Sequence, residues 1–386
     1  MNVDAAHLKV PFFRLELQDE DIDGVSSVLR SGWLTTGPQV ASFEQEFAQF
    51  IGPGVQAVAV SSNTAGMHLV LEALGIGPGD EVIVPTLTFT ATAEVVRYLG
   101  ADIVFVDVDP HSLCVSPDEI VAAITPRTRA IMPVHFGGLP CDMARIYRVA
   151  QPLGIAVVDD AAHAIPTAID GVHVGASASA AAIFSFYPNK TMTTGEGGMI
   201  VSRVEAITER CRLTRFHGID RDPFKRSKSD LSKGRYDVIA PGFKYNMTDM
   251  AAALGRTQLK RLEQSHLKRQ RIAMLYHQEF SGLPVTLPLW PDTLQTHSWH
   301  LYPLQLGDGI SREKFAEHLT RHGVGFSMHY TPLHQMTYWR SRYKLSDDQF
   351  PCATRYAARC LTLPLFASMR EEEISRVIEV VSSAFE

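Results

Sequence analysis

Residues 155–163 read IAVVDDAAH, an apolar run that ends in two carboxylates. Short apolar or β-branched runs of the same kind recur along the chain and predict strands at 58–60, 82–84, 103–106, 130–134 and 181–184. Between these runs the apolar residues follow a helical period, as at Val40, Phe43 and Phe47. From about residue 40 to residue 201 the alternation predicts βα units packed on a mainly parallel sheet, and therefore an α/β fold.

The composition is that of a soluble globular protein. With 386 residues, 45% hydrophobic and 20% charged, the chain can bury a large core in two or three domains. Its formal net charge of −6 shows no overall excess of basic residues, so nucleic-acid binding is not expected. No apolar run approaches the ~18 residues of a membrane span, and the N-terminus has no signal pattern. The five cysteines are scattered without a CxxC pair, so we expect a cytoplasmic protein without a zinc cluster or disulfides.

The pattern of apolar and charged residues changes after Gly242. A long, charged helical pattern runs from Arg256 through Arg261 and Arg269 to Arg271, and shorter strands follow around residues 299–304. We therefore expect a large domain of residues 1–255 with the mainly parallel sheet, and a smaller C-terminal α+β domain of residues 256–386.

Three polar features follow predicted strands, at the sheet edge where open α/β folds place their ligand sites. The first is VSSNTAG at residues 60–66, a strand that leads into a helix. Free amides at the helix start, with the Thr64 hydroxyl, can hold a phosphate. Alternatively, the hydroxyl residues are simply N-caps.

The second feature is the pair Asp159 and Asp160. A buried carboxylate needs a cation or hydrogen-bond donors, and a protonated pyridine nitrogen would suit Asp160. Alternatively, both side chains cap the following turn or bind a metal.

The third feature is IFSFYPNKTMTTGEGG at residues 183–198. A lysine between an apolar strand and a glycine-rich loop can be desolvated, which lowers its pKa and frees the amine to attack a carbonyl. Lys190 would otherwise be one more solvated surface lysine.

Taken in this order, the three motifs resemble the DegT/DnrJ/EryC1/StrS sugar aminotransferases. The resemblance extends from SGWLTTGP at residues 31–38 to LPLF at residues 363–366. It implies the aspartate aminotransferase-like fold type I with pyridoxal 5'-phosphate (PLP) as cofactor. Lys190 would be the Schiff-base lysine and later carry the proton between cofactor and substrate, while Asp160 would pair with the pyridine nitrogen.

The same resemblance implies the other cofactor contacts. Thr64, the Ala65 amide and Ser185 would bind the phosphate, joined by Asn246 of a second subunit, so a homodimer with shared sites is expected. Phe89 would stack on the cofactor ring, or else be a core aromatic at a helix start. His163 would lie against the other ring face or near the phenolic oxygen.

On the substrate side, residues 221–235 hold six basic residues against two acidic ones. We expect Lys225 and Arg226 in this stretch to clamp a nucleotide diphosphate, the alternative being a solvated loop. The resemblance also places His329, Trp33 and Thr35 near the sugar.

The overall impression is closest to the UDP-4-keto sugar aminotransferases that act at C4. The expected function is transfer of an amino group from L-glutamate to a nucleotide-linked keto sugar. The alternatives are a C3 aminotransferase of the same family and a non-catalytic regulatory or sugar-binding protein of this fold. A sugar 3-dehydratase is disfavoured because those relatives replace the lysine with histidine.

If the basic stretch grips a diphosphate, reversing two of its charges should weaken substrate binding. Lys225→Glu combined with Arg226→Glu should raise the KM for the nucleotide sugar in steady-state kinetics, and an unchanged KM would contradict the clamp.

Overall fold

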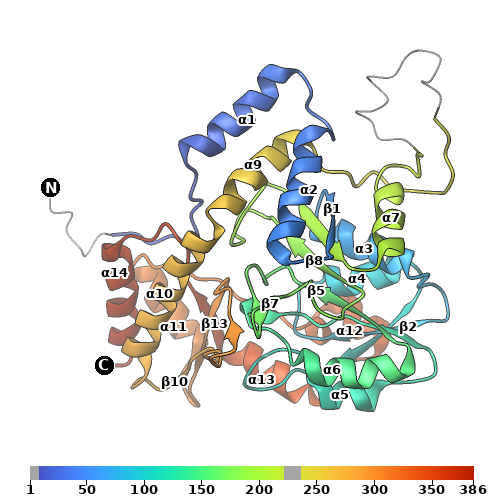
Figure 1. Ribbon diagram of the computed structural model, residues 1–386. Helices are drawn as coiled ribbons and strands as arrows, with labels where there is room; N and C mark the ends of the chain where they lie inside the picture. The colour runs from blue at the N-terminus through green and yellow to red at the C-terminus, as the bar shows by residue number, and fades with distance from the viewer. Residues whose placement is uncertain (1–7, 221–235) are drawn as a thin grey trace.

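The computed structural model describes residues 8–220 and 236–386. Its centre is a seven-stranded sheet with strand order β1-β9-β8-β5-β4-β2-β3 (Figure 1). The strands are β1 (Gln56–Val60), β2 (Glu81–Pro85), β3 (Asp102–Val106), β4 (Thr128–Ile131), β5 (Ala156–Asp160), β8 (Ala181–Ser185) and β9 (Gly198–Ser202). All six strands predicted from the sequence are present, although β4 ends at Ile131 and β5 starts one residue later than expected.

The sheet is mainly parallel, as predicted. β9 is the exception, since it lies between β1 and β8 and pairs with both of them antiparallel. Because β9 runs backwards, its first residue, Gly198, pairs with Val60 and with Ser185 at the carboxyl ends of its neighbours. The loop before β9 therefore lies at the same sheet edge as the ends of β1, β5 and β8.

Helices cover the sheet, and their buried positions follow the apolar periods of the sequence. Val40, Phe43 and Phe47 of α2 are buried, and Phe47 packs edge-on against Phe184 of β8. The helices of the first 214 residues are α1 (Asp19–Ser31), α2 (Pro38–Ile51), α3 (Asn63–Ala73), α4 (Ala91–Tyr98), α5 (Pro117–Ala123), α6 (Met143–Ala150) and α7 (Glu205–Thr214).

The C-terminal residues build a second core. A sheet of order β10-β12-β13 is covered by helices, and residues from Ile272 to Val381 pack together with Val10 (Figure 1). The elements of this core are α10 (Leu262–Phe280), β10 (Val285–Thr286), β12 (Tyr302–Leu306), α11 (Arg312–Arg321), β13 (Cys360–Leu363) and α14 (Glu371–Ser383). Three other C-terminal helices, α9 (Asp249–Lys260), α12 (Thr337–Tyr343) and α13 (Pro351–Arg359), bury their apolar residues in the cores around the large sheet. A third, small sheet holds β11 (Gln295–Thr296), β6 (Ala168–Ile169) and β7 (Val172–His173).

The expectation of one long charged helix after residue 256 is wrong. The segment forms two helices, because Arg261 has a backbone conformation outside the helical region and separates α9 from α10. Arg269 of this charged pattern is buried, and its guanidinium donates to the carbonyl oxygens of Trp299 and Leu365. The expected domain boundary at 255/256 falls within α9 and stays a prediction.

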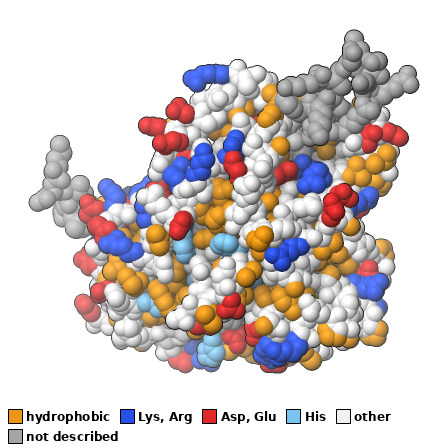
Figure 2. Space-filling view, in the orientation of Figure 1, with side chains coloured by type: hydrophobic (Ala, Val, Ile, Leu, Met, Phe, Trp, Pro, Cys, Tyr) orange, Lys and Arg blue, Asp and Glu red, His pale blue; other side chains and the backbone are white. Residues whose placement is uncertain are grey.

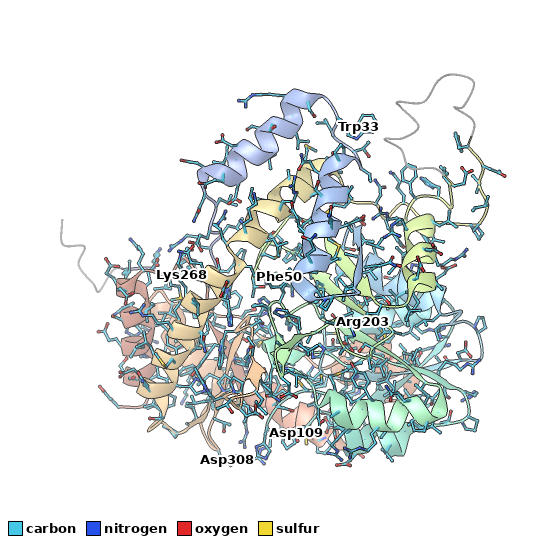
Figure 3. All side chains as sticks on the ribbon, viewed as in Figure 1. Trp33, Phe50, Asp109, Arg203, Lys268 and Asp308 are labelled. Atoms are coloured by element: carbon cyan, nitrogen blue, oxygen red, sulfur yellow. The ribbon has the colours of Figure 1, made fainter. Side chains whose placement is uncertain are left out.

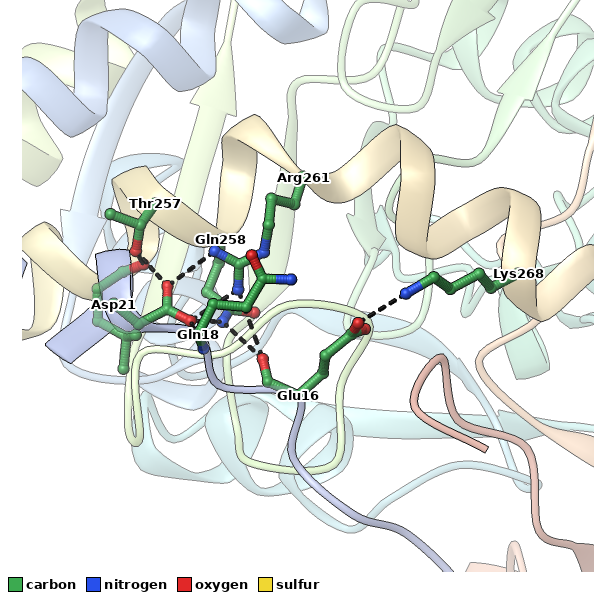
Figure 4. Close-up of polar contacts among 8 residues, drawn as sticks. Glu16, Gln18, Asp21, Thr257, Gln258, Arg261 and Lys268 are labelled. Atoms are coloured by element: carbon green, nitrogen blue, oxygen red, sulfur yellow. Dashed lines mark hydrogen bonds and ion pairs between the residues drawn. The ribbon is translucent and has the colours of Figure 1, made fainter. Parts of the chain in front are cut away.

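An ion pair between the buried Asp21 and the half-buried Arg261 joins the N-terminal helix to the α9–α10 junction (Figure 4). The Asp21 carboxylate accepts hydrogen bonds from Arg261, Thr257 and Gln258, and caps the Gln18 amide. Burial alone would raise the pKa of Asp21, but the donors around it outweigh that effect and lower the pKa. Asp21 therefore stabilises the fold as a carboxylate.

On the face shown in Figure 2, acidic and basic side chains are interspersed rather than gathered by sign. None of the helices in the described ranges combines the length and apolarity required to cross a membrane.

Replacing Asp21 should show how strongly this junction holds the fold. Asp21→Asn leaves the half-buried Arg261 without its counter-charge and weakens the charge-assisted hydrogen bonds to Asp21, so the free energy of unfolding at neutral pH should fall by roughly 2 kcal/mol. Because the folded-state pKa of Asp21 is depressed, this contribution exists above the ordinary pKa of 3.8 and disappears as the pH falls through the folded-state value.

Urea denaturation at several pH values measures the effect. The matched control is Glu371→Gln, which breaks an exposed pair with Arg271 and should leave stability unchanged. Equal stability of Asp21→Asn and the wild type at neutral pH would contradict the role of the pair.

Candidate active site

A cavity of about 440 Å³ lies at the sheet edge where β1, β5 and β8 end. The loop between β8 and β9, the start of α4 and the stretch before α12 complete its walls. Seven residues singled out from the sequence line it together: Thr64, Phe89, Asp160, His163, Ser185, Lys190 and His329. The fold thus brings together residues that are up to 265 positions apart, 329 − 64, in the chain.

Lys190 is held in the turn that leads from β8 back to β9. Its amide donates to the Tyr187 carbonyl at 3.0 Å, and the Thr194 amide closes the turn by donating to Phe186 at 3.0 Å. Burial lowers the pKa of the Lys190 amine to about 8, although the nearby Asp160 carboxylate opposes this shift. The unprotonated, nucleophilic amine is therefore far more abundant near neutral pH than it is for an ordinary lysine.

Asp160 ends β5 with its carboxylate buried against the cavity. The Thr92 hydroxyl donates to Oδ2 at 2.7 Å, and the Ala162 amide donates to Oδ1 at 3.1 Å. Burial raises the pKa of Asp160, while these two neutral donors and the charge of Lys190 pull it the other way. These donors orient the carboxylate, but they do not fully offset the cost of burying its negative charge. A cation in the cavity would stabilise that charge.

The N-terminus of α3 forms another wall. The Ser62 hydroxyl caps the helix by accepting the Ala65 amide at 3.0 Å, and the amides of Asn63 and Thr64 belong to the turn that a helix leaves without internal acceptors. A Cβ at Gly198 would come within 2.6 Å of the Ser62 backbone, so only glycine lets β9 approach this helix end. Ser185 faces the same region from the end of β8.

Aromatic and imidazole rings line the rest of the cavity. Phe89 is 59% exposed, so it is not the core aromatic that the alternative interpretation expected. The pKa of His163 is held well below its ordinary value by burial, and then by the charges of Lys190 and His329. Burial, followed by the charge of Lys190, lowers the pKa of His329 to about 4. Both imidazoles are therefore neutral near neutral pH.

Several residues predicted for the site lie outside the lining of the Lys190 cavity. Ala65 is outside the cavity lining, and its amide is already bonded to Ser62. Trp33 lies between α1 and α2 (Figure 3), where its indole donates to the Thr36 carbonyl at 3.0 Å. Asn246 donates to the Thr36 hydroxyl at 2.7 Å and lines a separate cavity of about 520 Å³.

Thr35 is exposed next to Thr36, with which Trp33 and Asn246 form their hydrogen bonds. The carbonyl oxygen of Thr35 accepts a hydrogen bond from the Asp249 amide. Lys225 and Arg226 lie outside the described residues.

Three further residues of the site were not found from the sequence: Tyr330 and Asn63 in the cavity lining, and Thr92 outside it. Tyr330 hydrogen-bonds to His163 at 3.0 Å, and Thr92 orients Asp160. Asn63 lies in the quoted strand-to-helix motif, but its Nδ2 donates to the Ile183 carbonyl at 2.8 Å, which no local pattern reveals. The only feature of the sequence that could have pointed to Tyr330 is its position next to His329.

Comparison with known proteins gives the family. The model of the DegT/DnrJ/EryC1/StrS aminotransferase family matches residues 15–382. Among solved structures, S. venezuelae DesV in complex with a ketimine intermediate is 32% identical, with 98% of this chain and 99% of that chain covered and a TM-score of 0.88. Sugar aminotransferase CalS13 from Micromonospora echinospora is 30% identical, with coverage of 97% and 99% and a TM-score of 0.87.

Spr1654 from Streptococcus pneumoniae, solved in a PLP-form, is 29% identical, with coverage of 98% and 100% and a TM-score of 0.90. The fold and the family match define an aminotransferase of fold type I, as predicted. The chain belongs to the DegT/DnrJ/EryC1/StrS aminotransferase family.

The undercompensated charge of Asp160 should be visible in the stability of the cofactor-free protein. Its folded-state pKa lies above the ordinary 3.8, so the cost in stability begins as the pH rises above 3.8 and is complete above the folded-state value. Asp160→Asn should therefore raise the Tm of the cofactor-free protein at neutral pH by about 2 °C or more, and the gain should vanish below pH 3.8.

Thermal denaturation after removal of the cofactor measures this difference. Asp23→Asn, an exposed change on α1, is the control and should leave the Tm unchanged. A lower Tm for Asp160→Asn at neutral pH would show that the carboxylate is well compensated after all.

Proposed function

We propose that this chain is a PLP-dependent aminotransferase that moves an amino group from L-glutamate to a nucleotide-linked keto sugar, at C4. The observation that carries the proposal is the meeting of Lys190, Asp160 and the α3 N-terminus around one cavity. An amine, a carboxylate and a phosphate cradle are the three groups that PLP requires of a protein.

The chemistry of the lining fits this cofactor. Asp160 is buried beside neutral donors and would hold the protonated pyridine nitrogen, which supplies the missing cation. Thr64 and Ser185, with the free amides at the start of α3, would hold the phosphate. Phe89 would lie against the ring. Bound there, PLP supplies an electron-withdrawing ring and an aldehyde carbon.

In this proposal Lys190 acts both as a nucleophile and as a proton carrier. With a pKa of about 8 its amine is readily available as a nucleophile toward the cofactor aldehyde. The same Nζ then accepts and returns protons during the exchange of amino groups, since a pKa near the working pH suits both directions. Glutamate and the keto sugar use the site in turn, which predicts ping-pong kinetics.

A second copy of the chain would complete the site. Trp33, Thr35 and Asn246 gather near Thr36, outside the lining of the Lys190 cavity. We propose a homodimer in which this group reaches the partner's cavity. The cytoplasmic location likewise remains a prediction.

The choice of substrate rests on the relatives and on the sequence. CalS13 is named as a sugar aminotransferase, which favours a sugar acceptor here. The basic stretch of residues 221–235 favours a diphosphate, and the resemblance of TTGEGG at residues 193–198 to C4-acting members favours C4 over C3.

A panel of nucleotide-linked 3-keto and 4-keto sugars, assayed with glutamate, tests the proposal. We expect 2-oxoglutarate release and amination of a 4-keto sugar, with ping-pong kinetics. Amination of 3-keto sugars alone would instead support the C3 alternative.

Lys190→Ala is the matched variant for this panel. It should abolish both turnover and the absorbance band of the lysine-bound cofactor, because the amine is the nucleophile. Turnover at the wild-type rate in Lys190→Ala would end the proposal, and a purified wild-type protein without the cofactor spectrum would favour the regulatory or binding protein.

A further inference from the structure

His163 and Tyr330 form a hydrogen-bonded pair in the wall of the Lys190 cavity. Tyr330 Oη lies 3.0 Å from His163 Nε2, and both residues line the cavity. On the far side of the imidazole, the Gly137 amide donates to Nδ1 at 3.2 Å. The ring is thus held between a backbone donor and a phenol.

The Gly137 amide determines which nitrogen of His163 carries the proton. An amide N–H can only donate, so Nδ1 must be the unprotonated, accepting nitrogen. A neutral imidazole then carries its hydrogen on Nε2. Since a ring whose Nδ1 accepts cannot also be doubly protonated, Nε2 donates to Tyr330 and the tyrosine oxygen is the acceptor in this pair.

Contacts outside the cavity keep the Gly137 amide in place. Gly137 has a φ of +64°, in the left-handed region that favours glycine, within the short turn Phe136–Gly138. The Leu301 amide donates to the Gly137 carbonyl at 3.1 Å. The Ser298 hydroxyl donates to the His163 carbonyl, so one C-terminal segment holds both the turn and the histidine.

The tautomer of His163 determines how the Tyr330 hydroxyl can form hydrogen bonds. Its oxygen accepts from His163, so its own hydroxyl hydrogen is available to donate. The ring of His329 lies closer, with centroids 5.0 Å apart, and its Nδ1 is paired with the Thr362 hydroxyl. The rings of Phe89 and Phe136, with centroids at 6.1 and 6.3 Å from that of Tyr330, offer no oxygen acceptor. The open side is the cavity.

We propose that Gly137 and His163 act as positioning residues that make Tyr330 a hydrogen-bond donor to an oxygen of the bound ligand. This rests on the proposed function and adds to it a specific recognition of an anionic or carbonyl oxygen. That oxygen belongs either to the ring of the cofactor or to the keto group of the acceptor sugar. His163 reaches it through Tyr330 rather than directly.

The tautomer can be tested without any turnover. In the cofactor-free protein with 15N-labelled histidine, NMR should show His163 with Nε2 protonated and Nδ1 unprotonated. His163→Gln assigns the resonances by their loss. A protonated Nδ1 would overturn the proposal whether or not the protein is an aminotransferase.

Tyr330→Phe tests the donor in the holoenzyme. It keeps the ring and removes only the hydroxyl, so kcat/KM for the keto sugar should fall by roughly tenfold. A shifted cofactor absorbance band in the absence of sugar assigns the hydrogen bond to the cofactor oxygen, whereas an unchanged band with a raised KM or lowered kcat assigns it to the keto oxygen. Tyr338→Phe, an exposed change on α12, is the control.

The positioning role predicts non-additivity. His163→Met removes the donor to Tyr330, while His163→Gln keeps an N–H at similar reach and should lose less activity. If His163 acts through Tyr330, the double variant His163→Met, Tyr330→Phe should be no worse than the more impaired single variant. Additive losses, or a Tyr330→Phe enzyme equal to the wild type in both spectrum and kinetics, would overturn the proposal.

Discussion

The buried charge of Asp160 is the constraint on which the site depends. A carboxylate at the end of a fully buried strand is stable only with donors and a counter-charge around it. Thr92 and Ala162 orient it without neutralising it, and Lys190 lies near enough to affect its titration. The cavity is therefore prepared for a ligand that brings a positive charge to one wall and a reactive carbon to the other.

The antiparallel strand β9 explains how the lysine reaches that cavity. If the chain after β8 continued in the parallel βα pattern, Lys190 would lead into a crossover helix. Instead the chain turns back beside β1, and Gly198 lets it pass close to Ser62 at the start of α3. The lysine turn, the end of β5 and the N-terminus of α3 are held at one edge by the same sheet.

The C-terminal residues contribute to the active-site wall as well as to their own core. His329 and Tyr330 line the cavity, and residues 298–301 hold the Gly137 turn and the His163 backbone. The pair of Asp21 and Arg261 ties the N-terminal helix to the α9–α10 junction. The position of each residue of the candidate site is therefore the result of packing between distant parts of the chain.

Six strands of the large sheet and helix α2 could be predicted because apolar periodicity is local, and Lys190 and Asp160 stood out because each follows a strand in a distinctive motif, but the antiparallel strand β9 was not predicted. The break at Arg261 and the burial of Arg269 could not, since a charged residue in a helical pattern looks the same whether it faces water or carbonyl groups. Nor could the pairing of His163 with Tyr330, 167 positions away, be inferred from either neighbourhood.

The sequence by itself thus determined the class of fold and the family, and it singled out the lysine and the carboxylate proposed to react, because strand periods and short motifs carry that information within a few residues. Only the tertiary structure decided how protons and charges are arranged around them. The state of Asp160 depends on its burial and donors, and the tautomer of His163 on an amide from another turn, and both are properties of contacts that form when the chain is folded.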